Sequence, residues 1–240
     1  MTGAFLNALG ILLGGLFGLA RSTPLSARTQ DFFRRALGVA AVYSGLRLVW
    51  LHINGTFLTC VKQIFIALIA LTIGHWIGKL LRLQTLSNHL GRHASGLISA
   101  VPAGKPRPPA DGFKACTILF CAAPLGVLGA VTDGLGEDYY LLAVKAVMDA
   151  LATASFVKIF GWPAALSAFP VYAVLGAITL AGRLCTRTLL AAPGLADSVM
   201  VTGGLTACVV ALVIFEVRKV ALANYLPGLL IAPLLTRLLP

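Results

Sequence analysis

Lys145 and Asp149 are the two residues of this sequence best placed to do chemistry together. They are four positions apart inside the apolar stretch 140–160, so on a helix their side chains can meet. Ionised side chains are costly at membrane depth and, where they occur, mark ion or proton sites or pair with each other. We therefore expect an ion or proton site, with Asp149 as ligand or proton carrier and Lys145 as its counter-charge. The alternative is a structural ion pair that fixes helix packing.

A short acidic turn follows the fourth apolar stretch and contains Thr132, Asp133 and Gly134, with Glu137 and Asp138 shortly after. Carboxylates at the mouth of a pathway raise the local concentration of cations, so these residues are candidates for an outer vestibule. Asp followed by Gly is also a common turn pair, and such an Asp can cap the helix that follows. Both interpretations of Asp133 stay open at the level of sequence.

Two asparagines, Asn7 and Asn224, fall within apolar segments near the two ends of the chain. In hydrocarbon a side-chain amide needs partners, which come from neighbouring helices or from a water-filled path. We expect both amides near Lys145 and Asp149 as ligand-binding groups, with hydrogen bonding between helices as the alternative role. Prolines in the apolar segments favour the first interpretation, because broken helices expose carbonyl and amide groups that can coordinate ions. These prolines are Pro124, Pro170, Pro227 and Pro233.

Gly10, Gly14 and Gly18 form a stripe along one face of the first apolar segment. Small residues at this spacing let another helix approach closely, so we interpret the stripe as a helix-packing surface, within the chain or between copies of a homo-oligomer. His89 and His93 are four positions apart, so on a helix they share one face and could hold a metal ion. Because no third ligand is near them in sequence, we expect a solvated helical turn and no metal site.

The 240-residue chain is 58% hydrophobic and contains 25 glycines, whereas only 11% of its residues are charged. Apolar residues and glycine make up about two-thirds of the chain, against about half in soluble domains, which excludes a water-soluble fold. The net charge of +11 comes mainly from Lys and Arg in short loops between apolar segments, with no basic stripe interleaved with aromatics. This pattern follows the positive-inside rule and argues against nucleic acid as a partner. The expected surroundings are the lipid bilayer.

Eight apolar stretches are long enough to cross a bilayer and predict an all-α bundle of about eight spans, within a range of about seven to nine. Cations are concentrated in alternate connections, which places those loops in the cytoplasm and both termini outside. Arg47, inside the second stretch, is expected to extend its charged end to the membrane surface. The predicted spans are 3–20, 36–53, 63–81, 115–132, 139–160, 163–182, 198–215 and 221–238.

The two ends of the chain resemble each other, which predicts two inverted three-helix repeats. Near the start of the chain, a Leu-Gly pair that ends at Gly14 is followed, after a charged loop, by Gly38. In the second half, a Leu-Gly pair that ends at Gly176 is followed, after a comparable loop, by Gly204. Because five spans separate the two starts, the copies cross the membrane in opposite directions, as in many transporters. The predicted divisions are a first repeat at 1–82, a cytoplasmic linker at 83–114, a central helix pair at 115–160 and a second repeat at 161–240.

Four motifs occur together and in this order: Gly3–Asn7 with Gly14, Gly15 and Gly18, then Thr132–Gly134, then Lys145 with Asp149, then Ala223–Pro233. With these motifs the sequence resembles the bacterial YqgA/YdfK membrane protein family, or domain of unknown function 554. The resemblance covers nearly the whole chain and implies an integral inner-membrane protein whose activity is unsettled. Two positions depart from the family pattern: Ala150 stands where the family usually has Gly, and Leu175 where it usually has Gln.

These observations together favour a secondary transporter or channel for a small solute, namely a cation or a solute coupled to a cation or proton. The alternative is a non-transporting scaffold or assembly protein that binds other helices through its glycine-rich surfaces. We expect neither an enzyme nor a cofactor, because the sequence has no HExxH, GxSxG or Walker motif. The residues expected to bind the solute or ion are Lys145, Asp149, Asp133, Thr132, Asn7 and Asn224.

The loop charges make a testable prediction of topology. In a background without the native cysteines, a cysteine at Glu137 should react with a membrane-impermeant thiol reagent added to intact cells. A cysteine placed between Lys105 and Pro109 should react only after the membrane is opened. Labelling of this second position in intact cells would show that the protein has the opposite orientation in the membrane.

Overall fold

The computed structural model describes residues 1–21, 26–99, 108–136, 138–188, 192 and 194–239, and every regular element in these ranges is a helix. This confirms the all-helical fold that the composition predicts. In chain order the elements are α1 (Thr2–Ala20), α2 (Ala27–His52), α3 (Phe57–Leu80), α4 (Leu83–Ser99), α5 (Pro109–Cys121), α6 (Pro124–Gly136), α7 (Tyr140–Phe160), the 3₁₀ helix η1 (Trp162–Ser167), α8 (Ala168–Thr188), α9 (Leu195–Ile214), the 3₁₀ helix η2 (Leu222–Tyr225) and α10 (Gly228–Leu238).

Five helical segments in the described part of the chain are long and apolar enough to cross a membrane: α1, α3, α7, α9 and the continuous η1–α8 segment. A sixth span results if α5 and α6 are counted together, although they are bent by 59° relative to each other. Two of the eight predicted spans, 36–53 and 221–238, do not meet these criteria. The first lies in α2, whose first turns carry Arg28, Asp31, Arg34 and Arg35. The second is divided by Pro227 into η2 and the short α10. The described part of the chain thus has the apolar helices of an integral membrane protein, with five or six candidate spans.

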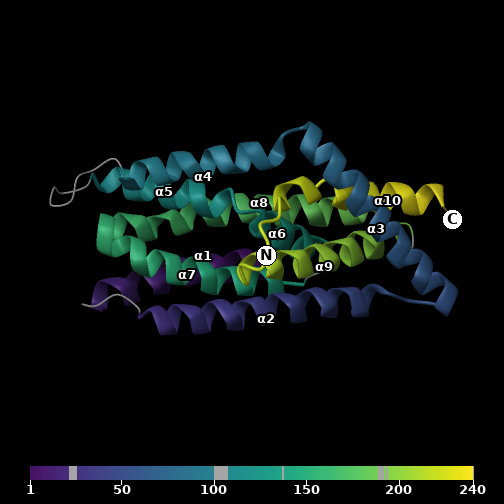
Figure 1. Ribbon diagram of the computed structural model, residues 1–240, viewed down its shortest axis with the longest axis horizontal. Coiled ribbons are helices and arrows are strands. Elements are labelled where there is room, and N and C mark those ends of the chain that lie inside the picture. Colours follow the sequence, from purple (N-terminus) through teal and green to yellow (C-terminus); the bar gives the residue numbers. More distant parts are fainter. Residues whose placement is uncertain (22–25, 100–107, 137, 189–191, 193, 240) are drawn as a thin grey trace.

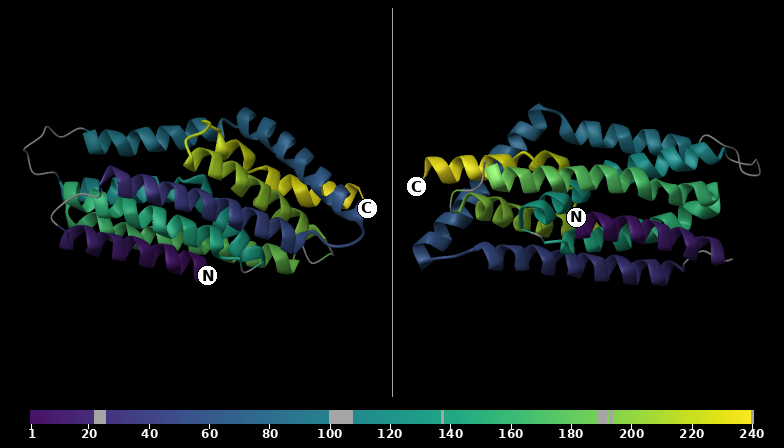
Figure 2. Two further views of the ribbon diagram at one scale, coloured as in Figure 1. Left: turned by 60° about the horizontal axis from the view of Figure 1, so that its bottom comes forward. Right: turned by 180° about the vertical axis from the view of Figure 1, so that it is seen from behind.

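The helices lie roughly side by side along the long axis of the molecule, and α3 crosses them obliquely at one end (Figure 1). In the same view α2 forms one edge of the bundle, and α4 and α5 lie together at the opposite edge. The first residue of α1 lies midway along the long axis in every view, whereas α10 reaches one end (Figure 2). Helix α1 therefore begins within the bundle, where its first main-chain amides need partners from other helices.

The most extensive helix contact joins α1 to α7, and glycines make it possible. The stripe of Gly10, Gly14 and Gly18 faces main-chain carbonyls on successive turns of α7. A methyl group added at Gly10 would lie 2.6 Å from the carbonyl oxygen of Ala146, and one added at Gly14 would overlap the carbonyl of Ala150. The stripe is therefore filled by another helix of the same chain.

Other long helix contacts use glycine in the same way. Helices α2 and α9 meet at Gly45 and Gly204, where a Cβ on Gly45 would lie 2.6 Å from the Gly204 carbonyl oxygen. Helix α6 packs on α8 at Gly134, and α3 packs on η2 and α10 at Gly74 and Gly78. Close contact at small residues, as is typical of membrane helices, thus fixes the relative positions of the helices.

The stretch 83–99, predicted as the first part of a linker, forms α4 and packs along α5. It contains no proline, so no residue in it prevents a helix. Its Ala94 is buried, whereas His89 and His93 are exposed. Within the described ranges no group of three or more His, Cys, Asp or Glu could hold a metal ion. Residues 100–107 of the predicted linker lie outside the described residues, and its last residues, 109–114, form the start of α5.

Gly14→Ala should destabilise the protein, because the new Cβ would overlap the Ala150 carbonyl where α1 meets α7. Overpacking of a close contact costs about 1–3 kcal/mol. Gly91→Ala in α4 is the matched control, since a methyl group there would have no atom within 4 Å and alanine favours a helix. Thermal unfolding in detergent should show a lower midpoint for Gly14→Ala alone. Equal midpoints for both variants and the unaltered protein would contradict the contact.

Candidate functional site

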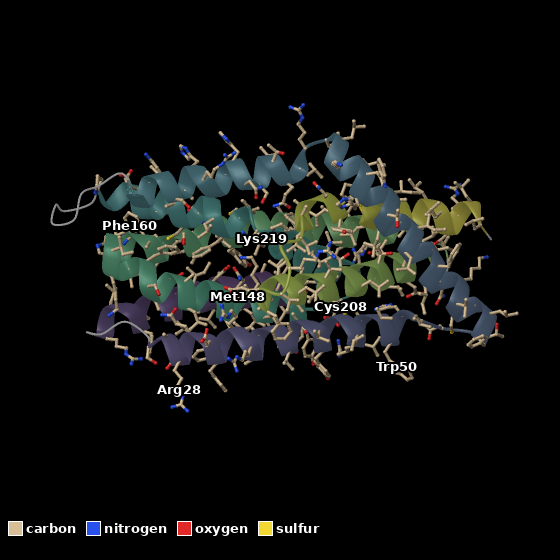
Figure 3. All side chains as sticks on the ribbon, viewed as in Figure 1. Arg28, Trp50, Met148, Phe160, Cys208 and Lys219 are labelled. Atoms are coloured by element: carbon tan, nitrogen blue, oxygen red, sulfur yellow. The ribbon has the colours of Figure 1, made fainter. Side chains whose placement is uncertain are left out.

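The middle of α7 carries both ionisable residues of the predicted site. This helix is continuous over 21 residues because it contains neither proline nor glycine, so Lys145 and Asp149 lie one turn apart on one face. Both are enclosed, with 1% of Lys145 and 6% of Asp149 exposed. Met148, the neighbour of Asp149, lies near the middle of the bundle, whereas Trp50 projects away from it (Figure 3). The pair is therefore buried near the centre of the molecule.

Asp149 accepts hydrogen bonds from two donors on one oxygen. The Lys145 ammonium forms an ion pair with Asp149 Oδ2 and donates to it, and the amide nitrogen of Asn7 donates to the same atom at 2.9 Å. A carboxylate only accepts, so the amide must turn its nitrogen toward Asp149 and its carbonyl oxygen away. That oxygen, Asn7 Oδ1, is buried and has no hydrogen-bond partner among the described residues. The site thus combines a neutral ion pair with an unused acceptor.

The bend between α5 and α6 borders the ion pair. Pro124 has no N–H, so the carbonyl of Phe120 cannot receive the usual helical hydrogen bond, and α5 ends at Cys121. The ring centre of Phe120 lies 5.8 Å from Lys145 Nζ. Beyond the bend, a Cβ at Gly126 would lie 2.7 Å from Lys145 Cε. Because the C-terminal end of a helix carries partial negative charge, the end of α5 favours a cation at this position.

Asp133 lies deep in the bundle and not in an open vestibule, because only 1% of it is exposed. Its Oδ2 accepts a hydrogen bond of 3.2 Å from the main-chain N–H of Gly3, in the first turn of α1. A carboxylate at this position compensates the free amides and the positive end of the helix dipole. Asp133 therefore caps α1, which neither predicted role anticipated. Thr132 donates to the carbonyl of Gly129 at 3.0 Å within α6.

Asp138 forms an ion pair with Arg47 of α2. The guanidinium carbon of Arg47 lies 4.2 Å from the ring centre of Tyr140, and Asp138 Oδ1 accepts from the Tyr140 main-chain N–H at 3.2 Å. Arg47 is expected to extend its charged end to the membrane surface, and in the structure this end reaches the carboxylate of the loop before α7. Asp138, and not Asp133, accepts a hydrogen bond from the first residue of the helix that follows the turn. Glu137 lies outside the described residues.

Asn224 makes its hydrogen bonds with α4 and not with the ion pair. Its carbonyl oxygen accepts from the main-chain N–H of Gln84 at 3.1 Å, and the Gln84 side chain accepts from the Ala223 N–H at 3.1 Å. The expectation that Asn224 would contact the pair is wrong because the chain leaves its helical path before Pro227. Asn224 then lies in the 3₁₀ turn η2, whose main-chain groups take partners from the start of α4.

Sequence reasoning missed three contributors to this arrangement: Phe120, Gln84 and the contact of His52 with Asp197. His52 Nδ1 lies 2.8 Å from Asp197 Oδ1 and joins the end of α2 to the start of α9. Pro124 was the available signal for the bend that brings Phe120 to the pair. No spacing pattern connects His52 with Asp197 or Gln84 with η2, because these residues are more than a hundred positions apart in sequence.

Comparison with known proteins supports the resemblance seen in the motifs. The family described as "Protein of unknown function (DUF554)" matches residues 2–237. The chain is 25% identical over 233 residues to the uncharacterized membrane protein YdfK of Bacillus subtilis (strain 168), covering 97% of this chain and 94% of YdfK. It is 26% identical over 234 residues to the uncharacterized protein YqgA of Escherichia coli (strain K12), covering 96% and 94%. No solved structure matches the chain.

A double-mutant cycle should show that Lys145 and Asp149 stabilise each other. Asp149→Leu leaves the ammonium buried without its partner, Lys145→Met does the same to the carboxylate, and each loss costs about 3–5 kcal/mol. The double variant removes both charges at similar volume and should recover most of this loss. Unfolding of all four proteins in detergent measures the coupling free energy. Additive losses in the double variant would contradict the pairing.

Proposed function

Because the chain belongs to the DUF554 family and is an integral membrane protein, we propose that it is a secondary transporter or channel for a small cation, or for a solute coupled to a cation or proton. The observation that carries the proposal is the Lys145–Asp149 ion pair, buried beside a broken span with the Asn7 amide on the same carboxylate oxygen. Charged groups at membrane depth commonly mark ion pathways. In this proposal Asp133 and Asn224 position the surrounding elements and do not bind the ion.

The contacts among helices support an inverted repeat. The proposed correspondence relates α1 to α8, α2 to α9, α3 to α10 and α6 to α7. Under this exchange the α1–α7 contact becomes the α8–α6 contact and the α2–α7 contact becomes the α9–α6 contact, and all four are present. The α3–α9 and α9–α10 contacts have no counterpart of similar extent among the described residues. A two-fold axis between the halves produces such a pattern, and transporters with inverted repeats bind their substrates at the repeat interface. The pair on α7 lies at that interface in this scheme.

A groove runs along α7 beside the residues that neighbour the ion pair in sequence. It has a volume of about 350 Å³ and lies between α2 and α7, lined among others by Met148, Leu151, Ser155 and Arg34. Its lining residues on α7 run from Met148 to Ser155, and neither Lys145 nor Asp149 lines it. The positive-inside rule places the Arg34 end in the cytoplasm of a protein in the bacterial inner membrane. Under the proposed function, this groove is the hollow on the cytoplasmic half of α7 that lies nearest in sequence to the ion pair.

The glycine stripe gives little support to the alternative of a non-transporting scaffold or assembly protein. That alternative requires the glycines of α1 to receive helices of other proteins. Gly10, Gly14 and Gly18 instead lie against α7. A buried ion pair with an unused acceptor oxygen has no evident purpose in a scaffold, whereas a transporter requires such groups near the middle of the membrane.

Ion flux in liposomes tests the proposal. The purified protein should raise the flux of sodium, potassium or protons above that of empty liposomes. The double variant Lys145→Met with Asp149→Leu should fold but lose this flux, because it keeps the volume of the pair and removes its charges. Lys158→Met, on the exposed end of the same helix, is the control and should keep the flux. Full flux in the folded double variant would exclude the pair as the site.

A further inference from the structure

An open hollow of about 540 Å³ runs along the polar side of α4, at the edge of the bundle opposite α2 (Figure 1). Leu119 of α5 gives it an apolar wall. Gly91 keeps the space open, because a Cβ at this position would have no atom within 4 Å. Among the described residues, none of α7 lines the hollow, so it is separate from the Lys145–Asp149 pair. The residues of α4 that line it are Thr85, Ser87, Asn88, Gly91, Arg92 and Ser95.

The lining offers hydrogen-bond donors and one positive charge. Arg92 carries the charge and five N–H donors. The side-chain oxygen of Asn88 accepts a hydrogen bond of 2.9 Å from Gln84, so the amide nitrogen of Asn88 is left to donate elsewhere. The hydroxyl groups of the lining can donate as well. Because α4 contains no Asp or Glu, this set of groups suits an oxyanion and not a cation.

Arg92 has no partner within the described part of the chain. It forms no hydrogen bond or ion pair with any residue there, whereas Arg34 and Arg47 are paired with carboxylates. Its side chain is exposed, as are those of Thr85 and Asn88. Charged and amide groups on a helix surface are costly against acyl chains. The outer face of α4 therefore belongs at the level of water and lipid headgroups, where an anion can reach Arg92.

The sequence around the hollow is strongly basic. Residues 79–114 include one carboxylate, Asp111, and six cations: Lys79, Arg82, Arg92, Lys105, Arg107 and Lys114. The positive-inside rule places this segment in the cytoplasm. The cytoplasmic leaflet contains anionic lipids, and basic sites on that side of a membrane protein bind their headgroups. The charge of the segment and its expected position thus both favour an anionic lipid.

We propose that this hollow binds the phosphate group of an anionic phospholipid of the cytoplasmic leaflet. Arg92 holds the phosphate, the Asn88 amide and the nearby hydroxyl groups donate to its oxygens, and Leu119 contacts the apolar part of the lipid. A guanidinium can bind phosphate oxygens through two parallel hydrogen bonds, which suits arginine to such a site. A lipid is favoured over free phosphate, because the apolar wall stabilises lipid carbons and offers nothing to a soluble anion.

Binding of single lipids to the detergent-solubilised protein tests the proposal, with native mass spectrometry as the readout. The first molecule of phosphatidylglycerol should bind at least about fivefold more tightly than that of zwitterionic phosphatidylcholine. Arg92→Gln should remove this preference, because it removes the charge-assisted hydrogen bonds to the phosphate. Arg237→Gln is the matched control and should keep the preference. Arg237 is exposed in α10, which lies toward the opposite end of the molecule from α4 (Figure 1).

Filling the hollow is a second test, and it keeps Arg92 in place. Gly91→Leu puts a side chain into the hollow and should abolish the preference for phosphatidylglycerol. Gly96→Leu is its control, because a Cβ there also has no atom within 4 Å, yet Gly96 does not line the hollow. Neither new Cβ meets a neighbouring atom, so both variants should fold, which thermal unfolding in detergent checks.

Inorganic phosphate distinguishes a lipid from a soluble source of the phosphate group. At the same concentration as phosphatidylglycerol it should displace little of the bound lipid. Displacement of most of the lipid would indicate a site for soluble phosphate and overturn the lipid assignment.

The variants give the remaining outcomes. A preference for phosphatidylglycerol that is lost in Arg92→Gln and Gly91→Leu, and kept in both controls, supports the site. A preference that persists in either of the first two variants, or equal binding of both lipids by the unaltered protein, would overturn it. None of these measurements depends on flux, so failure of this inference leaves the proposed transport function as it stands.

Discussion

Burial of the Lys145 ammonium inside an apolar helix bundle is the constraint on which the arrangement around it depends. An unpaired charge at this depth costs about 2.5–3.5 kcal/mol on insertion scales, so a carboxylate must lie within reach. Asp149 supplies it one turn away on the same helix. Asn7 can reach that carboxylate because glycines let α1 approach α7 so closely. The bend at Pro124 then brings the negative end of α5 to the same ammonium.

Because the charges of Lys145 and Asp149 compensate each other, the site is also suitable for the movement of an ion. Lys145 and Asp149 are neutral as a pair, so their burial is tolerated, yet the carbonyl oxygen of Asn7 is buried without a hydrogen-bond partner among the described residues. A purely structural pair would be expected to satisfy all of its polar atoms, since each buried unsatisfied group costs about 1–3 kcal/mol. The unsatisfied oxygen of Asn7 therefore favours a ligand that binds and leaves. Helices α1, α5 and α7 hold the site without large loops.

Local features of this molecule could be predicted from sequence, whereas long-range contacts could not. The spacing of Lys145 and Asp149 places them on one helical face, and composition alone predicts an all-helical membrane protein. Which distant group meets them depends on helix packing, so nothing in the sequence favoured Asn7 over Asn224. For the same reason, an Asp-Gly turn could not indicate that Asp133 caps a helix more than a hundred residues away.

The central claim is that the buried Lys145–Asp149 pair, with the Asn7 amide on the same carboxylate oxygen, is the cation site of a transporter or channel. Crystals soaked in thallium(I), a monovalent cation with a strong anomalous signal, test this claim most directly. We predict an anomalous peak within bonding distance of the Asp149 carboxylate and the Asn7 carbonyl oxygen, with Lys145 turned toward Phe120. A map at saturating thallium(I) with no peak there, and with the ammonium still on Asp149, would contradict the claim.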